Sequence, residues 1–249
     1  MIYKHSGTFG DLLYSLSVVK KMTPGTFAIA LNNLESCVAQ YGYRPDEVDP
    51  MHKGRLTVGD FNLLEPLLRR QSYITDVQPW KGIHDVDLDR FRGVLFRGFE
   101  GNYVQSYHMT FGIPVTPEVL QESWLEADAK TIAPIVINRT FRYRCPNGDS
   151  TWQNMLAEAN IAQNGIFVGN DEEHKDFVKL TGFNVSYYPV KDFKDLADVI
   201  AGADLFMGNQ SAAYSIAMGL GKSAVLETIK IKPLQNNECY FPRDNCQYF

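Results

Sequence analysis

Apolar positions recur with two different periods along the chain, and the two periods follow one another in turn. Short apolar runs that predict strands occupy residues 2–5, 26–31 and 74–77. Helical spacing predicts helices over 11–20, near 61–68 and over 103–111. In the first of these helices Leu12, Leu13, Leu16 and Val19 lie on one face, which we expect to be buried. Residues 32–56 have no such pattern and predict a loop, whereas 83–97 predict a polar surface segment.

The pattern restarts after a polar segment at 126–133. Predicted strands lie at 135–138, 166–168, 184–188, 204–207 and 223–227, and predicted helices near 151–162, near 172–180, at 192–202 and at 211–220. Strands that alternate with helices indicate a parallel sheet covered on both faces. The sequence therefore predicts an α/β protein of two Rossmann-like domains, residues 1–128 and 129–249. No internal repeat is visible.

Composition narrows the class of protein. The 249 residues are 45% hydrophobic, enough for one large core or two modest ones. No run of about 18 apolar residues is present, and a secretory leader is not indicated, so we expect a cytoplasmic protein without a membrane span. The net charge of −5 does not indicate a broad nucleic-acid surface, although DNA remains a possible partner through a local basic stripe. The four cysteines (Cys37, Cys145, Cys239 and Cys246) lack zinc spacing, so no metal site is expected.

The segment 203–221 has the strongest chemical signal. An apolar strand runs into Gly208, the polar residues Asn209, Gln210 and Ser211 follow, and a helix of small residues begins at about Ser211. A helix start at the carboxyl end of a parallel strand offers free N–H groups and a partial positive charge, which suit a pyrophosphate. The alternative is that these polar residues only cap the helix.

This segment resembles the carboxyl-terminal signature of the heptosyltransferase family of GT-B glycosyltransferases. The matching residues are Gly208, Asn209, Ser211, Ala217, Leu220, Gly221 and Lys222. Gln210, Ala212 and Ser215 stand where that family has Asp, Gly and His. The resemblance implies two Rossmann-like domains that face each other across a cleft, with Asn209, Gln210, Ser211 and Ser215 at the donor phosphates.

The amino-terminal loop supports the same resemblance. Gly10 and Asp11 precede an apolar helix, as in that family, where the aspartate is the general base and the loop faces the cleft. The resemblance implies that Asp11 is catalytic. We also expect Gly10 among the donor-binding residues, and we expect His5 to touch the acceptor because it ends the first predicted strand and faces the same cleft. The local alternatives are an acidic residue favoured by the helix dipole for Asp11 and a hydrogen-bonded structural histidine for His5.

Three further groups follow strands of the second half. Arg139, Arg142 and Arg144 come directly after a strand, and guanidinium groups bind phosphate oxygens in pairs; we expect Arg139 and Arg142 to contact the donor. The resemblance implies that Glu172 or Glu173 holds the nucleotide ribose, the alternative being acidic residues of a solvated helix start. Glu227 ends the last predicted strand and either contacts the sugar or caps the sheet edge.

These features together predict an inverting, metal-independent glycosyltransferase. It would move a sugar from a nucleotide-diphosphate donor to an acceptor hydroxyl, on a glycan or on a hydroxylated DNA base. The sugar nucleotide is a co-substrate, and no cofactor is expected. The alternatives are a non-catalytic binder of nucleotides or nucleotide sugars, and a sugar-nucleotide epimerase or hydrolase.

Overall fold

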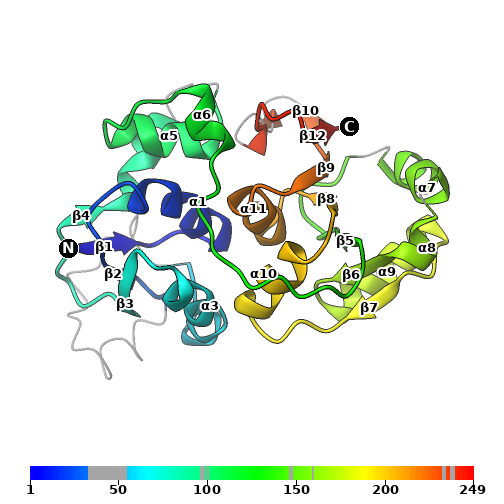
Figure 1. Cartoon of the computed structure of the whole chain (residues 1–249), viewed down its shortest axis with the longest axis horizontal. Helices are drawn as coiled ribbons and strands as arrows, with labels where there is room; N and C mark the ends of the chain where they lie inside the picture. The colour runs from blue at the N-terminus through cyan, green and yellow to red at the C-terminus, as the bar shows by residue number, and fades with distance from the viewer. Residues whose placement is uncertain are drawn as a thin grey trace. The chain divides into compact units, whose positions relative to one another are not determined.

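The computed structural model describes residues 1–32, 55–95, 99, 101–145, 148–158, 160–231, 234–235 and 239–249 (Figure 1). Most of the loop predicted at 32–56, with Cys37, lies outside these residues. The chain forms two compact units. The first comprises Met1–Thr116 with Trp124–Glu126, and the second comprises Pro117–Ser123 with Ala127–Phe249.

The first unit contains a four-stranded parallel sheet in the order β3-β2-β1-β4. Its elements are β1 (Ile2–His5), α1 (Phe9–Val19), β2 (Gly25–Ile29), α3 (Val58–Arg70), β3 (Ile74–Pro79), β4 (Val86–Asp87), the 3-10 turn η2 (Leu88–Phe91), α4 (Arg92–Leu95) and α5 (Tyr103–Thr110). Strands were predicted at three of these four positions. The fourth, β4, corrects the interpretation of 83–97 as polar surface, because it pairs with β1 and sets Asp87 opposite Lys4.

Helix α1 is more deeply buried than its pattern predicts. Every residue from Leu12 to Val19 is buried, not just one apolar face. Helix α5 packs against α1, and the buried residues of α1 include the polar Ser15 and Ser17. Both hydroxyls donate to carbonyl oxygens one turn earlier, Leu12 O at 2.7 Å and Tyr14 O at 2.8 Å, and these bonds offset their burial.

The second unit contains a six-stranded parallel sheet in the order β12-β9-β8-β5-β6-β7. Its elements are α6 (Pro117–Gln121), β5 (Ile135–Asn138), α7 (Gly148–Glu158), α8 (Ile161–Asn164), β6 (Gly165–Val168), α9 (Asp171–Thr181), β7 (Ser186–Tyr188), α10 (Phe193–Ala201), β8 (Leu205–Asn209), α11 (Ala212–Gly219), β9 (Ser223–Glu227), the hairpin β10 (Lys230–Ile231) and β11 (Leu234–Gln235), and β12 (Cys246–Tyr248). Numbered from β5, this is the 3-2-1-4-5-6 strand order of dinucleotide-binding sheets.

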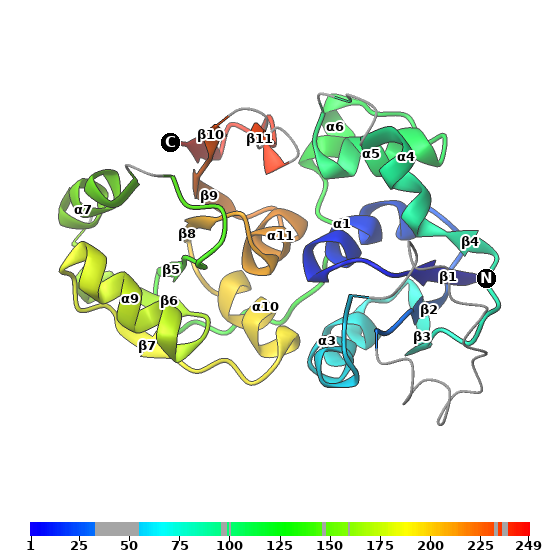
Figure 2. The ribbon, with the colours of Figure 1, turned by 180° about the vertical axis from the view of Figure 1, so that it is seen from behind.

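Helices cover both faces of this sheet, as the sequence predicts. Figure 2 shows α10 and α11 on one side and α7 and α9 on the other, and Figure 1 shows α8 on the same side as α9. Trp152, Phe167 and Phe177 form the centre of a buried apolar cluster under the second group. The carboxyl-terminal tail adds the sixth strand, β12, alongside β9.

Candidate functional site

The chain of the second unit reverses its direction of winding between β5 and β8. The two strands are neighbours in the sheet, yet the chain passes from β5 to β6 on one side and from β8 to β9 on the other. Ligands of open α/β sheets bind in the crevice outside the carboxyl ends of two such strands. Residues 139–145 follow β5 and residues 210–211 follow β8, so the predicted donor residues of both segments lie at this edge.

Asn209 joins these two segments. Its Oδ1 accepts from the Thr140 amide at 3.0 Å and from the Thr140 hydroxyl at 3.3 Å. Its Nδ2 donates to the carbonyls of Thr140 at 3.0 Å and Arg142 at 2.6 Å. The side chain is fully buried. Asn209 was predicted to contact the phosphates, but its amide group holds the loop after β5 instead.

Helix α11 begins at Ala212, and Ser211, where the small-residue pattern placed its start, is the capping residue. The Ser211 hydroxyl accepts from the Tyr214 amide at 3.2 Å, and the buried Ser215 hydroxyl donates to Ser211 O at 3.1 Å. Ser211 therefore has the role that the capping alternative predicts, and the Ser215 hydroxyl is bonded within the helix. Within the described residues no acceptor meets the amides of Ala212 and Ala213, so the helix start keeps two free donors.

Three buried polar atoms at the same edge have no partner among the described residues. They are Asn138 Oδ1, Arg144 Nη2 and Gln210 Oε1. The orientation of the Asn138 amide is fixed because its Nδ2 donates to Val168 O at 2.7 Å. Buried polar groups are rarely left unpaired in proteins. This edge therefore offers a ligand one hydrogen-bond donor and two acceptors.

Arg139 and Glu227 face each other inside the second unit. Arg139 Nε and Nη2 donate to Glu227 Oε2 and Oε1 at 2.7 and 2.8 Å, and Arg139 Nη1 donates to Asp149 at 2.6 Å. Glu227 also accepts from Trp152 Nε1 at 3.0 Å. The side chains of Arg139 and Glu227 are 1% and 0% exposed. Arg139 was predicted to contact phosphate and Glu227 to contact sugar or cap the sheet; both are engaged inside the protein.

The other two arginines of this loop differ from Arg139. Arg144 forms an ion pair with Asp176 at 2.5 Å and donates from Nε to Thr140 O at 2.9 Å. Arg142 is exposed, and its guanidinium contacts only the hydroxyl and ring of Tyr143 among the described residues. Its backbone carbonyl is held by Asn209. Arg142 is thus the arginine of this segment whose charge is available to a ligand.

The two predicted ribose residues begin α9, after β6. Glu173 closes a capping box with Asn170: its amide donates to Asn170 Oδ1 at 2.7 Å, and its carboxylate accepts from the Asn170 amide at 3.2 Å. Burial raises the pKa of Glu173, and hydrogen bonds from backbone amides together with the charge of Arg144 oppose the rise. Glu172 is exposed and keeps its carboxylate free of protein donors among the described residues.

In the first unit β1 and β4 form the corresponding pair of neighbouring strands. Gly10 and Asp11 lie in the first turn of α1, just after β1. Asp11 Oδ2 accepts from the Thr8 amide at 3.0 Å and lies 3.4 Å from Arg92 Nη2. No donor among the described residues meets Asp11 Oδ1, and the side chain is 17% exposed. One oxygen of Asp11 thus caps the helix and the other remains free.

His5 ends β1 and is fully buried, so it cannot touch an acceptor as predicted. Its Nδ1 accepts from the Gly7 amide at 2.8 Å, and therefore the ring proton lies on Nε2, which donates to the Tyr107 hydroxyl at 2.6 Å. Tyr107 in turn donates to the backbone carbonyl of Asp11 at 3.0 Å. Burial lowers the pKa of His5 to about 4, against the opposing effect of the Asp89 carboxylate. A neutral His5 thus ties β1 to α1 through Tyr107.

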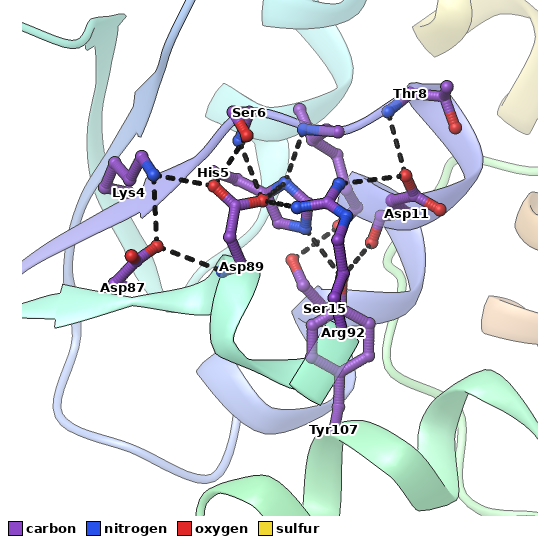
Figure 3. A network of polar contacts seen from close by, with 12 residues as sticks. Lys4, His5, Ser6, Thr8, Asp11, Ser15, Asp87, Asp89, Arg92 and Tyr107 are labelled. Atoms are coloured by element: carbon purple, nitrogen blue, oxygen red, sulfur yellow. Dashed lines mark hydrogen bonds and ion pairs between the residues drawn. The ribbon is translucent and has the colours of Figure 1, made fainter. Parts of the chain in front are cut away.

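Asp89 is the centre of a polar network that the sequence analysis missed. Figure 3 shows it between Lys4, Ser6 and Arg92. Lys4 Nζ and Ser6 Oγ both donate to Asp89 Oδ2 at 2.7 Å, and Arg92 Nη1 donates to Asp89 Oδ1. Burial would raise the pKa of Asp89, but its contacts with His5, Lys4 and Arg92 outweigh burial and hold the pKa well below its usual range.

A signal for this network was present in the sequence. Asp85, Asp87 and Asp89 alternate with apolar residues at the period of a strand. The predicted strand at 2–5 contains Lys4, and a lysine in a buried strand requires an acidic partner. The two observations together predict a strand pair between these segments, which the register of β1 and β4 realises.

Two other properties concern the described part of the chain. It contains no cluster of three or more histidine, cysteine or acidic side chains that could hold a metal ion. None of its helices has the length and apolar character needed to cross a bilayer.

No protein-family model matches the chain, and no curated protein matches it significantly. Several solved structures do. Heptosyltransferase WaaC of E. coli, with ADP-2-deoxy-2-fluoro heptose, aligns with a TM-score of 0.52 and 13% identity over 100% of this chain and 92% of WaaC. A glycosyl transferase of family 9 from Veillonella parvula aligns with a TM-score of 0.54 and 10% identity, over 100% of this chain and 84% of that one.

A third structure is the iron-containing dodecameric glycosyltransferase TibC of enterotoxigenic E. coli. It aligns with a TM-score of 0.53 and 16% identity, over 97% of this chain and 60% of TibC. At such identities the likeness concerns the fold. The two parallel α/β units of this chain therefore constitute a heptosyltransferase-like GT-B fold, as the motifs around Asp11 and Asn209 predicted.

Proposed function

We propose that this protein is a glycosyltransferase that moves a sugar from a nucleotide-diphosphate donor to an acceptor hydroxyl. The observation that carries the proposal is the Asp11 carboxylate. Its Oδ2 is held by the Thr8 amide, and its Oδ1 has no donor among the described residues. A carboxylate held in this way can take the proton of a hydroxyl as that hydroxyl attacks an anomeric carbon.

Features of the second unit support binding of the donor. The amides of Ala212 and Ala213 at the start of α11 can donate to a diphosphate, and Arg142 can neutralise part of its charge. Gln210 Oε1 lies at the same edge, has no partner among the described residues and can accept from a ligand hydroxyl. Glu172 is an exposed acid at the start of α9 that can accept from the ribose. Buried hydrogen bonds stabilise this edge, and their side chains are Arg139, Asn209 and Glu227.

The finer features of the reaction remain part of the proposal. Attack by a hydroxyl activated by Asp11 on the side opposite the leaving diphosphate would invert the anomeric centre. Arginine and helix N–H groups can stabilise a leaving diphosphate without a metal ion. The glycosyl group is a hexose or a heptose, and WaaC, with its bound ADP-heptose analogue, suggests ADP-heptose as the first donor to test. The acceptor is a glycan or a hydroxylated DNA base.

Two measurements test the proposal. The first is thermal stabilisation by ADP-, UDP-, GDP- and CMP-sugars, which identifies the donor. The second is product analysis for the stabilising donor, with and without glycan and DNA acceptors. We expect acceptor-dependent sugar transfer, and we expect Asp11→Asn to bind the donor normally but to lose roughly 100-fold or more in kcat. Full turnover in Asp11→Asn would contradict the role of Asp11 as base.

A non-catalytic nucleotide-sugar binder is the second candidate. It is favoured by the side chains of Asn209 and Ser215, both buried and bonded to the protein itself. Such a binder would be stabilised by a nucleotide diphosphate but would form no product from any donor. An epimerase or hydrolase would convert the donor with no acceptor present, so the same product analysis separates all three functions.

A further inference from the structure

We infer that Arg92 is a positioning residue for Asp11. This inference rests on the proposed function, in which Asp11 is the base. Arg92 begins α4, immediately after η2, and its guanidinium reaches two carboxylates. Nη1 donates to Asp89 Oδ1, and Nη2 lies 3.4 Å from Asp11 Oδ2 (Figure 3). A planar guanidinium presents its N–H donors in a rigid fork and can hold two carboxylates at fixed positions, whereas the donors of a lysine rotate on a flexible stem.

Asp89 makes this bridge rigid. It is buried, and it is anchored independently of Arg92 by the Lys4 ammonium and the Ser6 hydroxyl. Asp89 lies closer to the guanidinium than Asp11 does, so the single positive charge of Arg92 is shared between two carboxylates. Arg92 can therefore orient Asp11 without neutralising it.

The contact decides which oxygen of Asp11 faces a ligand. Asp11 Oδ2 is directed to Arg92 and to the Thr8 amide, so only Oδ1 remains for an acceptor hydroxyl. The other charged or titratable groups near Asp11 cannot do the same. His5 is neutral, Tyr107 binds the Asp11 backbone carbonyl rather than its carboxylate, and Asp89 repels it. Without Arg92 the carboxylate keeps a single anchor and can rotate.

Turnover in a double-mutant cycle tests this role. Arg92→Gln is expected to lower kcat by about 10-fold to 100-fold, the effect of a misplaced catalytic group, with KM for the sugar nucleotide unchanged. In the Asp11→Asn background Arg92→Gln should cause no further loss, because there is no base left to orient. Arg92→Lys should keep most of the kcat defect. Arg90→Gln removes an exposed cation of the same segment and should leave kcat unchanged.

Equal losses from Arg92→Gln in the two backgrounds, or a defect in KM alone, would overturn the inference. A second measurement, of thermal stability, needs no sugar nucleotide. Arg92→Gln should lower Tm by less in the Asp11→Asn background than in the parent protein, and equal Tm losses would also overturn it. If instead Asp11→Asn keeps full turnover while the two residues are coupled in Tm, the proposed base is wrong and the Arg92–Asp11 contact stands.

Discussion

Arg139 and Glu227 form a bidentate ion pair between the ends of β5 and β9. The two residues are 88 positions apart in the chain, and both side chains are almost completely buried. Asp149 and Trp152 complete the cluster at the start of α7. A charge in such a position is stabilised only by its partner, because water cannot reach it. The pair therefore fixes the start of the loop after β5, and this loop carries Arg142.

Removing one member of this pair should destabilise the protein strongly. Glu227→Gln keeps the shape of the side chain but leaves Arg139 without its main counter-charge, and it is expected to cost about 3–5 kcal/mol of unfolding free energy. Urea unfolding followed by tryptophan fluorescence measures the loss, since Trp152 contacts Glu227 directly. Asp171→Asn breaks an exposed ion pair with Lys175 and serves as the control. A loss no larger than that of the control would show that the pair is dispensable.

Asn209→Asp tests the amide that joins the two loops of the candidate donor site. An added carboxylate oxygen would face the carbonyls of Thr140 and Arg142, where Nδ2 now donates at 3.0 and 2.6 Å. We expect a loss of about 1–3 kcal/mol in stability and weaker stabilisation by nucleoside diphosphates. Asn170→Asp is the matched control, because at that helix start the side chain acts as an acceptor. Normal stability in Asn209→Asp would contradict the assigned orientation.

Arg142→Ala separates ligand binding from folding. Arg142 is exposed and has no acidic partner among the described residues, so its removal should leave Tm unchanged. Affinity for the nucleoside diphosphate of the selected donor should fall about 10-fold, which corresponds to about 1.4 kcal/mol. Calorimetric titration at two salt concentrations measures it, with Lys179→Ala as the control for an exposed cation of the same unit. Unchanged affinity would remove Arg142 from the proposed site.

His5 should make stability depend on pH. Its pKa is lowered by burial to about 4 in the folded protein, against about 6.5 in the unfolded chain, so between these values the unfolded state binds the extra proton. Stability from the neutral ring is complete above pH of about 6.5 and is lost as pH falls toward 4, by about 3 kcal/mol in all.

Unfolding curves between pH 4 and 7 measure this slope. The groups that face His5 are Asp89, Asp11, Arg92, Lys4 and Tyr107, and the acids among them favour its protonated form. His5→Gln should flatten the slope, whereas His84→Gln, at an exposed position, should keep it. An unchanged slope in His5→Gln would show that another group titrates. Asp89 contributes in a separate window, because its lowered pKa means that its stabilisation is lost only at still lower pH.

Local sequence patterns were sufficient for most of the secondary structure. The strands 2–5, 135–138 and 223–227 have the predicted bounds because each is a short run of mainly buried residues that separates helical periods. Ser211 was recognised as a helix start because capping depends on residues three positions apart. These features depend on neighbours in sequence, and the alternation of strands and helices implied two parallel sheets.

Long-range contacts decided the chemistry of the candidate sites. Position in the sequence made Arg139, His5 and Glu227 equally good ligand residues, but Asp149, Tyr107 and Trp152 occupy their polar atoms in the folded chain. Strand β4 was missed because its polar alternation becomes a buried strand only when Lys4 supplies the opposite charge. The amino-acid sequence by itself determined most of the elements and their alternation, because those follow from local periodicity. Which charged side chains remain free for a ligand was decided only by the tertiary structure, because a buried charge must find its partner wherever the fold brings one.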